Sequence, residues 1–224
     1  MSTDPFEEHV DLYERWFEKN HLAYESELRA VASLLPHGGV GIEIGVGTGR
    51  FAAPLGIRLG VEPSEPMAAI ARQRGIEVIQ GVAESLPFAG ARFEFALMVV
   101  TLCFVDDAPL SIQEAYRVLK DGGWLIVGFI DRQSPLGRRY QNRKVESVFY
   151  RDARFYSADE VIGLMQTAGF REFSSVQTLF QDGLRIQTPD PVRPGHGQGS
   201  FVVLRGTKPQ ERSIAQEITV KADR

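Results

Sequence analysis

The spacing of apolar side chains changes near residue 40 and divides the chain into two parts. Before that point, apolar residues recur every three, four or seven positions, as in a helix that buries one face. Asn20-His21 can divide this stretch into two helices, and Pro36-His37-Gly38-Gly39 ends it. We therefore expect residues 1–37 to form an N-terminal helical cap with an apolar stripe of Phe6, Val10, Tyr13, Phe17, Tyr24, Leu28, Val31 and Leu35.

Beyond residue 40, short apolar runs with strand character alternate with helical stretches. Helix signals follow Ser64, begin at Pro109 and start at the capping box Ser157-Ala158-Asp159-Glu160. This alternation predicts a mostly parallel, doubly wound sheet in a single domain over residues 1–206, followed by a flexible polar tail over residues 207–224. The predicted strands are Val40–Ile44, Arg58–Glu62, Glu77–Gln80, Phe93–Val100, Trp124–Ile130, Phe173–Phe180 and Phe201–Arg205.

A glycine-rich turn, Gly45-Val46-Gly47-Thr48-Gly49, directly follows the first predicted strand. Glycine permits positive φ angles and lets a ligand approach the backbone closely. The spacing differs from the dinucleotide fingerprint, because Arg50 stands where its third glycine belongs. Glu43 places an acid two residues before the first glycine, which suits a cationic nucleoside better than a pyrophosphate. The turn therefore favours a positively charged cofactor over a nicotinamide dinucleotide.

This segment resembles motif I of class I S-adenosylmethionine-dependent methyltransferases, and the spacing of later segments resembles the ubiquinone/menaquinone-type methyltransferase group. The resemblance covers roughly residues 38–130, which it implies to be the core that binds S-adenosyl-L-methionine. It implies a Rossmann-like, doubly wound sheet of seven strands, mostly parallel with one antiparallel strand, and helices on both faces. The chain departs from the pattern twice. Only Arg50–Gly56 follow the turn where relatives have a helix, and Cys103 and Phe104 stand where many relatives carry histidines.

Several further cofactor residues are implied by the same resemblance. Glu62 matches the acid that binds the ribose, and a carboxylate there can accept both hydroxyl hydrogens. The segment of Ala83 and Glu84 matches the one that lines the adenine, and Met98 and Val99 match positions beside the methionine part. The N-terminal helix matches a segment that covers the cofactor. The predicted cofactor-binding set is Tyr13, Trp16, Glu43, Gly45, Gly47, Gly49, Glu62, Pro63, Met67, Ala83, Glu84, Met98 and Val99.

The acceptor side is expected in two loops that follow the fifth and sixth strands. If these strands are parallel, their following loops, Asp131–Tyr156 and Asp182–Ser200, reach the cofactor face and form a substrate lid. Residues 132–154 include seven basic and two acidic side chains in a chain of net charge −4. This excess suggests a hypothesis in which the acceptor carries an anionic group; the alternative is a solvated helix face.

Individual acceptor-side candidates follow from these positions. Phe104, Arg138 and Arg139 are the predicted substrate residues. No catalytic residue is assigned beyond His196, the one histidine placed in a lid loop and so a candidate general base. No histidine and carboxylate residues share the spacing of a metal site, so we expect no metal.

Composition excludes several classes of partner. The net negative charge disfavours nucleic acid, and no apolar run has the ~20 residues that span a bilayer. A polar N-terminus without a signal peptide and a single cysteine lead us to expect a cytoplasmic protein. The predicted function is methyl transfer from S-adenosyl-L-methionine to a small-molecule acceptor by in-line displacement. A non-catalytic protein that binds this cofactor and a nicotinamide-dependent oxidoreductase are the alternatives, and no pattern indicates the acceptor atom or the oligomeric state.

Overall fold

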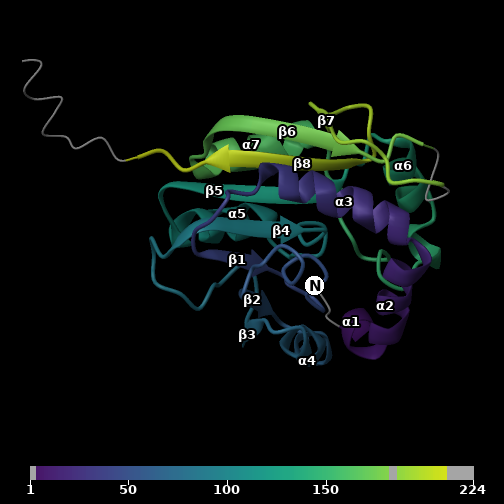
Figure 1. The fold of residues 1–224 in the computed structure, drawn as a ribbon, viewed down its shortest axis with the longest axis horizontal. Coiled ribbons are helices and arrows are strands. Elements are labelled where there is room, and N and C mark those ends of the chain that lie inside the picture. Colours follow the sequence, from purple (N-terminus) through teal and green to yellow (C-terminus); the bar gives the residue numbers. More distant parts are fainter. Residues whose placement is uncertain (1–3, 182–185, 211–224) are drawn as a thin grey trace, which may run out of the picture.

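The computed structural model describes residues 4–181 and 186–210, so most of the expected tail lies outside the described residues. Its centre is one eight-stranded sheet in the order β3-β2-β1-β4-β5-β8-β6-β7 (Figure 1). The strands are β1 (Gly41–Ile44), β2 (Leu59–Glu62), β3 (Glu77–Gln80), β4 (Phe93–Val99), β5 (Leu119–Ile130), β6 (Arg171–Thr178), β7 (Arg193–Pro194) and β8 (Phe201–Thr207).

The prediction of a mostly parallel sheet is confirmed, but the expected seven strands with one antiparallel strand are wrong. Strands β1 to β5 are mutually parallel, and β8 lies antiparallel between β5 and β6. The eighth strand, β7, pairs antiparallel with β6 at the sheet edge through Arg193 and Pro194. Strand β7 has only two residues, too few to show an alternating pattern in the sequence. Its Pro194 is tolerated because the strand lies at the edge of the sheet.

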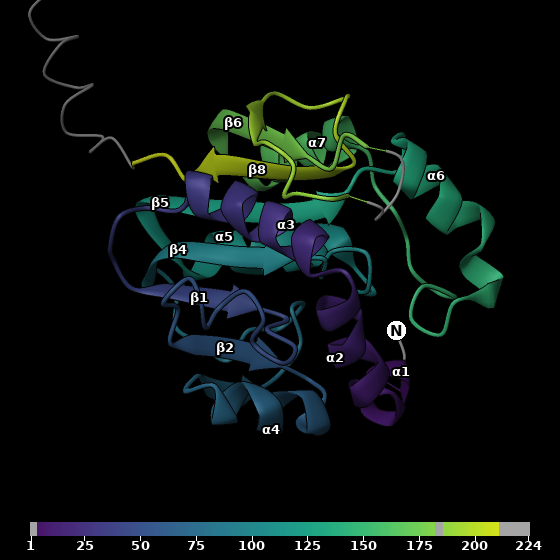
Figure 2. The same ribbon diagram turned by 45° about the vertical axis from the view of Figure 1, so that its right-hand side comes forward.

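Helices cover both faces of the sheet, as predicted. One face packs against α3 and α4 and the other against α5 and α7 (Figure 2). The expected break at Asn20 is present, and His9 adds a second break. Ser134 caps an additional helix in the lid segment, accepting the Gly137 N–H at 2.9 Å. The helices are α1 (Asp4–Glu8), α2 (Val10–Lys19), α3 (His21–Leu34), α4 (Glu65–Gln73), α5 (Ala108–Val118), α6 (Pro135–Asn142) and α7 (Ala158–Ala168).

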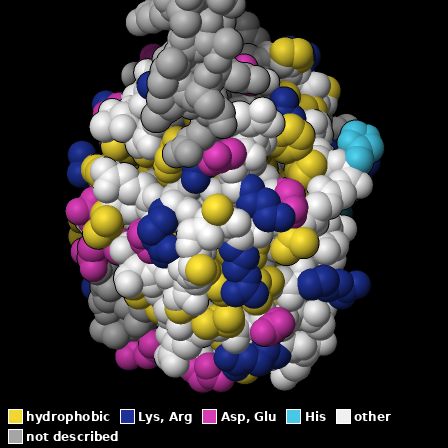
Figure 3. Space-filling view, turned by 90° about the vertical axis from the view of Figure 1, so that its left-hand side faces the viewer, with side chains coloured by type: hydrophobic (Ala, Val, Ile, Leu, Met, Phe, Trp, Pro, Cys, Tyr) yellow, Lys and Arg dark blue, Asp and Glu magenta, His cyan; other side chains and the backbone are white. Residues whose placement is uncertain are grey.

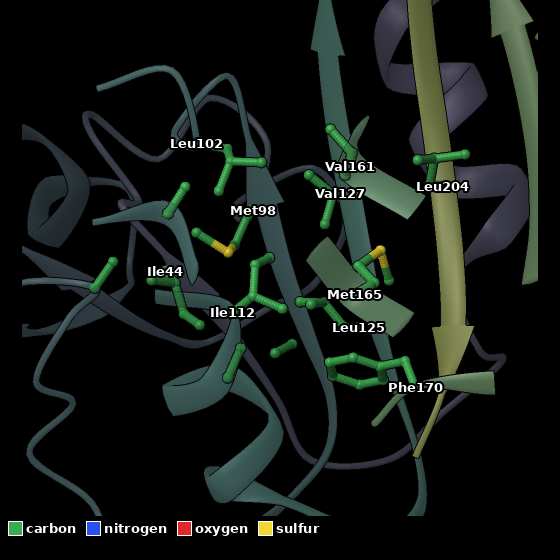
Figure 4. Close-up of a cluster of buried hydrophobic side chains, with 14 of the residues drawn as sticks. Ile44, Met98, Leu102, Ile112, Leu125, Val127, Val161, Met165, Phe170 and Leu204 are labelled. Carbon is green, nitrogen blue, oxygen red and sulfur yellow. The ribbon is translucent and has the colours of Figure 1, made fainter. Parts of the chain in front are cut away.

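The larger hydrophobic core lies between the sheet and helices α5 and α7 (Figure 4). Met98 belongs to this core, where it lies near Ile44 and Ile112 and is fully buried. Its side chain therefore packs on the α5 face and does not lie beside the methionine part of a cofactor as expected. Alternation along β4 explains this correction, because neighbouring side chains point to opposite faces and Val99 belongs to the core on the α3 side.

The order in which successive strands are placed in the sheet reverses between β1 and β4. Successive strands first step outward from β1 to β3, and the chain then returns to place β4 on the other side of β1. Such a reversal opens a crevice at the carboxyl ends of the two strands. Helices α1, α2 and α6 all lie beyond these carboxyl ends (Figures 1 and 2). The fold therefore predicts a ligand site between these helices and the sheet.

The segment after β1 is shortened, as the sequence predicted. Residues 50–56 form turns and not an α-helix, with the Ala53 N–H donating to Gly49 O at 3.1 Å and the Leu55 N–H to Phe51 O at 3.2 Å. The opposite end of the sheet, at the amino ends of its parallel strands, carries basic and acidic side chains interspersed with apolar ones (Figure 3). Among the helices that the structure describes, none combines the length and apolar character needed to cross a bilayer.

Candidate active site

A cavity of about 820 Å³ lies at the carboxyl ends of β1, β2, β4 and β5. This volume falls within the range of small-molecule sites. Helices α1 to α3, the loops after β3 and β4, and the segment after β5 provide the rest of the wall. Nine aromatic side chains line it, namely Phe6, Tyr13, Trp16, Phe17, Phe51, Phe104, Tyr140, Phe149 and Tyr150.

The glycine turn forms the part of the wall nearest β1. Gly45 has φ +70°, and a Cβ atom there would lie 2.4 Å from Thr101 Cγ2, so no other residue fits without a shift. Gly47 has φ +54° and opens toward the cavity, where a Cβ would lie 3.3 Å from the Tyr13 hydroxyl and 3.5 Å from Met67 Cε. The bare backbone at Gly47 therefore lets a ligand lie against the turn beneath Tyr13.

Two residues of the motif, Glu43 and Gly49, lie away from the cavity wall. Gly49 lets the turn pack against Ile76, whose Cδ1 would lie 2.4 Å from a Cβ at this position. Glu43 is only 2% exposed, and its Oε2 has no hydrogen-bond partner. Burial raises the pKa of Glu43 well above its usual range, and the nearby Glu62 raises it further. A hydrogen bond from the Ala52 N–H acts in the opposite direction and lowers it. The expectation that Glu43 contacts the ligand is corrected by its position, because its side chain is buried beneath the turn and does not line the cavity.

Glu62, predicted to bind the ribose, places a carboxylate at the cavity wall. Its Oε2 accepts the Gly47 N–H at 2.8 Å, and its Oε1 accepts the Ser64 N–H at 3.1 Å. Burial raises the pKa of Glu62, although these two hydrogen bonds oppose that rise. Each oxygen keeps a further acceptor position, so the fixed carboxylate can receive two hydroxyl groups of a ribose. These observations fit a nucleoside cofactor at this end of the cavity.

The predicted adenine wall lies beside Glu62. Three of its predicted residues line the cavity there, namely Pro63, Met67 and Ala83. The side chains of Met67 and Ala83 are buried. Glu84 also lines it, but its carboxylate accepts the backbone N–H groups of Asp106 and Asp107 at 2.7 and 3.3 Å. Glu84 therefore joins this wall to the loop that precedes α5, a link that no sequence pattern indicated.

Helix α2 is held over the glycine turn by a cluster of charges that the sequence analysis did not find. Glu14 accepts hydrogen bonds from Thr48 Oγ1 at 2.5 Å, from Arg50 Nε at 3.1 Å and from Arg74 Nη2 at 2.5 Å. The guanidinium of Arg50 also lies 5.0 Å from the Phe17 ring centroid. Arg50, which replaces the third glycine of the dinucleotide fingerprint, therefore fixes the helix that carries Tyr13 and Trp16.

Replacing Glu14 by glutamine should loosen α2. Burial opposes ionisation of this carboxyl, but hydrogen bonds from Arg74, Arg50 and Thr48 outweigh it and lower its pKa to about 2. We expect a loss of about 2 kcal/mol in the free energy of unfolding at pH 7, as for a half-buried ion pair that loses one partner. The loss should disappear as the pH falls from 4.5 toward 2, where the native Glu14 takes up its proton.

Urea unfolding at several pH values measures this effect. Glu18→Gln is the matched control, because Glu18 lies on the same helix and is exposed. Equal stabilities of the Glu14 and Glu18 variants at pH 7 would contradict the assigned role.

Only some of the predicted acceptor-side residues line the cavity. Phe104 and Arg139 line the cavity, whereas Arg138 does not. His196 lies 4.0 Å from Asp159 Oδ1 on α7, and no described residue of 186–200 reaches the cavity wall. The described part of this loop packs against α3, where the Asp190 N–H donates to Ser26 Oγ at 2.8 Å. His196 is thus removed from the cavity, and of the two predicted lid loops the one after β5 supplies the lining residues that the structure describes.

The cavity also contains a buried acid that the sequence analysis took as part of the N-terminal cap. Glu27 on α3 lines the cavity and is 4% exposed. Tyr140 and Tyr150 line the wall as well, from the lid segment after β5. Within the described parts of the chain, no three or more histidine, cysteine, aspartate or glutamate side chains are grouped to hold a metal ion.

The parallel sheet, the glycine turn at its reversal point and the acid that ends β2 define a Rossmann-like domain that binds a nucleoside cofactor. A family model described as a methyltransferase domain matches residues 42–127. The protein MJ1123 of Methanocaldococcus jannaschii is 43% identical over 203 residues, covering 91% of this chain and 98% of that protein. The chain belongs to the S-adenosylmethionine-dependent methyltransferases, and S-adenosyl-L-methionine is its cofactor.

A solved structure shows the same architecture. A Thermotoga maritima protein, described as an S-adenosylmethionine-dependent methyltransferase and a possible histamine N-methyltransferase, is 56% identical. The two superpose with a TM-score of 0.91 over 92% of this chain and 100% of that one. The ubiquinone/menaquinone C-methyltransferase of Stenotrophomonas maltophilia is more distant, at 33% identity over 118 residues, or 46% of each protein.

Proposed function

We propose that this methyltransferase transfers the methyl group of S-adenosyl-L-methionine to a small-molecule acceptor by in-line displacement. The observation that supports this proposal most strongly is one cavity that joins the glycine turn and Glu62 to an aromatic space at the end of β5. The cofactor supplies a methyl group on a positively charged sulfur. Side chains that align an acceptor with that methyl group can contribute roughly 7–11 kcal/mol, without covalent chemistry by the protein.

The residues of the wall perform three tasks in this proposal. Glu62 binds the ribose, and Gly47 leaves room for the cofactor against the backbone. Tyr13, whose hydroxyl end lies next to Gly47, is placed to interact with the sulfonium charge. The aromatic lining excludes water and holds a small acceptor against the methyl group.

The relatives suggest which acceptors to test first. The Thermotoga maritima protein makes histamine one candidate. The resemblance to the ubiquinone/menaquinone-type group makes a quinone precursor another, but its support covers only 46% of this chain. Single-turnover transfer of a labelled methyl group into histamine and into a metabolite mixture tests the proposal. Binding of the cofactor without any methyl transfer would favour the non-catalytic alternative.

An anionic group on the acceptor could be bound by the two exposed arginines of the cavity wall, Arg139 and Arg143. Arg139 and Arg143 line the cavity and are exposed, whereas Arg132 forms an ion pair with Glu160. If the acceptor carries an anion, Arg139→Gln combined with Arg143→Gln should raise its KM about tenfold, as expected when roughly 1.4 kcal/mol of interaction is lost. Arg138→Gln is the matched control, since Arg138 is exposed but lies outside the wall. Steady-state kinetics measures the effect, and an unchanged KM in the double variant would exclude an anionic group.

A further inference from the structure

Glu27 is a buried acid whose carboxyl group has no hydrogen-bond or ion-pair partner among the residues that the structure describes. It is 4% exposed and lines the cavity. Among the residues that the structure describes, none donates a hydrogen bond to this carboxyl or forms an ion pair with it. Burial of an acid without a partner is costly, so such groups in a cavity wall usually interact with a ligand.

The position of Glu27 in the fold places it at the acceptor end of the cavity. Helix α3 packs on β5, β6 and β8, whereas Glu62 ends β2. The strand order places β1 and β4 between β2 and β5, so α3 packs on strands that are separated from the strand of Glu62. The cofactor fits the end with Glu62 and the glycine turn, which leaves Glu27 to the second substrate.

Aromatic side chains line the same cavity wall as Glu27. The negative charge of Glu27 would reach the hydroxyls of Tyr140 and Tyr150 from the lid segment. Tyr150 stacks on Tyr140 with ring centroids 5.0 Å apart and on Phe104 at 5.6 Å. Aromatic faces and a carboxylate both attract a cation, and both disfavour an anion. The inner part of the acceptor space is therefore shaped for a positively charged or basic group.

We propose that Glu27 binds the ammonium group of an amine acceptor and removes one of its protons, an inference that rests on the proposed function. The proton moves from nitrogen to a Glu27 carboxylate oxygen, which leaves a neutral amine with a free lone pair. That lone pair forms the new N–C bond while the C–S bond breaks and its electron pair goes to sulfur. The product is an N-methylammonium ion, and the Glu27 proton passes to water.

The protonation behaviour of Glu27 supports this role. Burial raises the pKa of Glu27 to about 8, so its basicity is close to that needed to accept a proton near neutral pH. The titratable groups that respond to its charge are Tyr24 on the same helix and Tyr140 and Tyr150 on the lid segment. The pKa of all three tyrosines is raised by burial, so they stay neutral, and Arg139 is the cation near Tyr140.

Calorimetry with matched probes tests the binding step. The full-length protein, saturated with S-adenosylhomocysteine, is titrated with 2-phenylethylamine, 2-phenylethanol and phenylacetate at pH 8. We expect the amine to bind at least tenfold more tightly than the alcohol, and the carboxylate to bind most weakly. Glu27→Gln should abolish this preference and leave the affinity for S-adenosylhomocysteine within twofold. Glu25→Gln, an exposed change on the same helix, should retain the preference.

Methyl transfer to 2-phenylethylamine tests the proton step. Glu27→Gln should lower kcat by roughly 10²–10⁴-fold, the range for loss of a general base, and move the acidic limb of the kcat/KM profile to the pKa of the free amine. Glu27→Asp should restore part of the kcat and part of the wild-type pH profile of kcat/KM. An amine preference that persists in Glu27→Gln, or tighter binding of phenylacetate than of the amine, would overturn the inference. Failure to bind S-adenosylhomocysteine at all would instead overturn the proposed function.

Discussion

Glu62→Ala is expected to weaken the binding of S-adenosyl-L-methionine and of S-adenosylhomocysteine by at least about 100-fold. The carboxylate of Glu62 is fixed by the N–H groups of Gly47 and Ser64 and faces the cavity. A hydrogen bond to a charged group contributes about 1.5–3 kcal/mol, so the loss of two such bonds to a ribose accounts for a change of this size. The variant also removes the acceptor that holds the Gly47 N–H in the glycine turn.

Isothermal calorimetry with both ligands measures this loss. Glu65→Ala provides the matched control, because Glu65 lies three positions further along, is exposed, and pairs only with Arg72 on the surface. We expect the control to bind within twofold of the wild type. Glu62→Gln should lie between the two, since an amide keeps one acceptor oxygen but no charge. Cofactor affinity within threefold of the wild type in Glu62→Ala would exclude the assigned role in ribose binding.

Glu27→Gln is expected to make the ligand-free protein more stable at alkaline pH. The folded protein holds the Glu27 proton up to a pKa of about 8, whereas the unfolded chain releases it near 4.5. The wild type therefore loses stability as the pH rises through this window, and the variant does not. Since each pKa unit corresponds to about 1.4 kcal/mol, the difference in the free energy of unfolding should be on the order of 4 kcal/mol at pH 9 and close to zero at pH 4.5.

Urea unfolding between pH 4.5 and 9 shows whether the two curves diverge with this sign. Burial also raises the pKa of Glu43 and of Glu62, but both acids are present in the two proteins, so their effect cancels in the difference. Glu25→Gln should follow the wild type, because Glu25 is exposed and pairs with Arg29 on the same helix. Parallel curves for Glu27→Gln and the wild type would show that the Glu27 carboxyl is not desolvated in the folded protein.

Amine binding connects this stability effect with function. An ammonium ion beside Glu27 would supply a countercharge, so the ionised carboxylate becomes favourable when the acceptor is present. The acid that destabilises the empty protein at alkaline pH is then the group that selects the substrate. Active sites commonly show this exchange of stability for function.

The local sequence was sufficient to predict most of the secondary structure. Strands such as Glu77–Gln80 were predicted with the observed bounds, and the capping box at Ser157 starts α7 as expected. The glycine turn and Glu62 were found because they are adjacent to strand ends, where neighbouring residues determine both the backbone and its direction. The strand β7 was missed because two residues at an edge have no period, and α6 was missed because its segment is polar.

The sequence by itself predicted the alternating elements, since each depends on residues close together in the chain, and the resemblance of its glycine turn to motif I implied the cofactor. Only the tertiary structure decided which side chains share the cavity. Glu14 meets Arg74 across 60 residues, and Glu27 belongs to the same wall as Tyr140 and Tyr150. It also decided that Glu43 is buried and that His196 lies elsewhere. These outcomes depend on how helices pack over the sheet, and burial, which sets the charge of each acid, exists only after that packing.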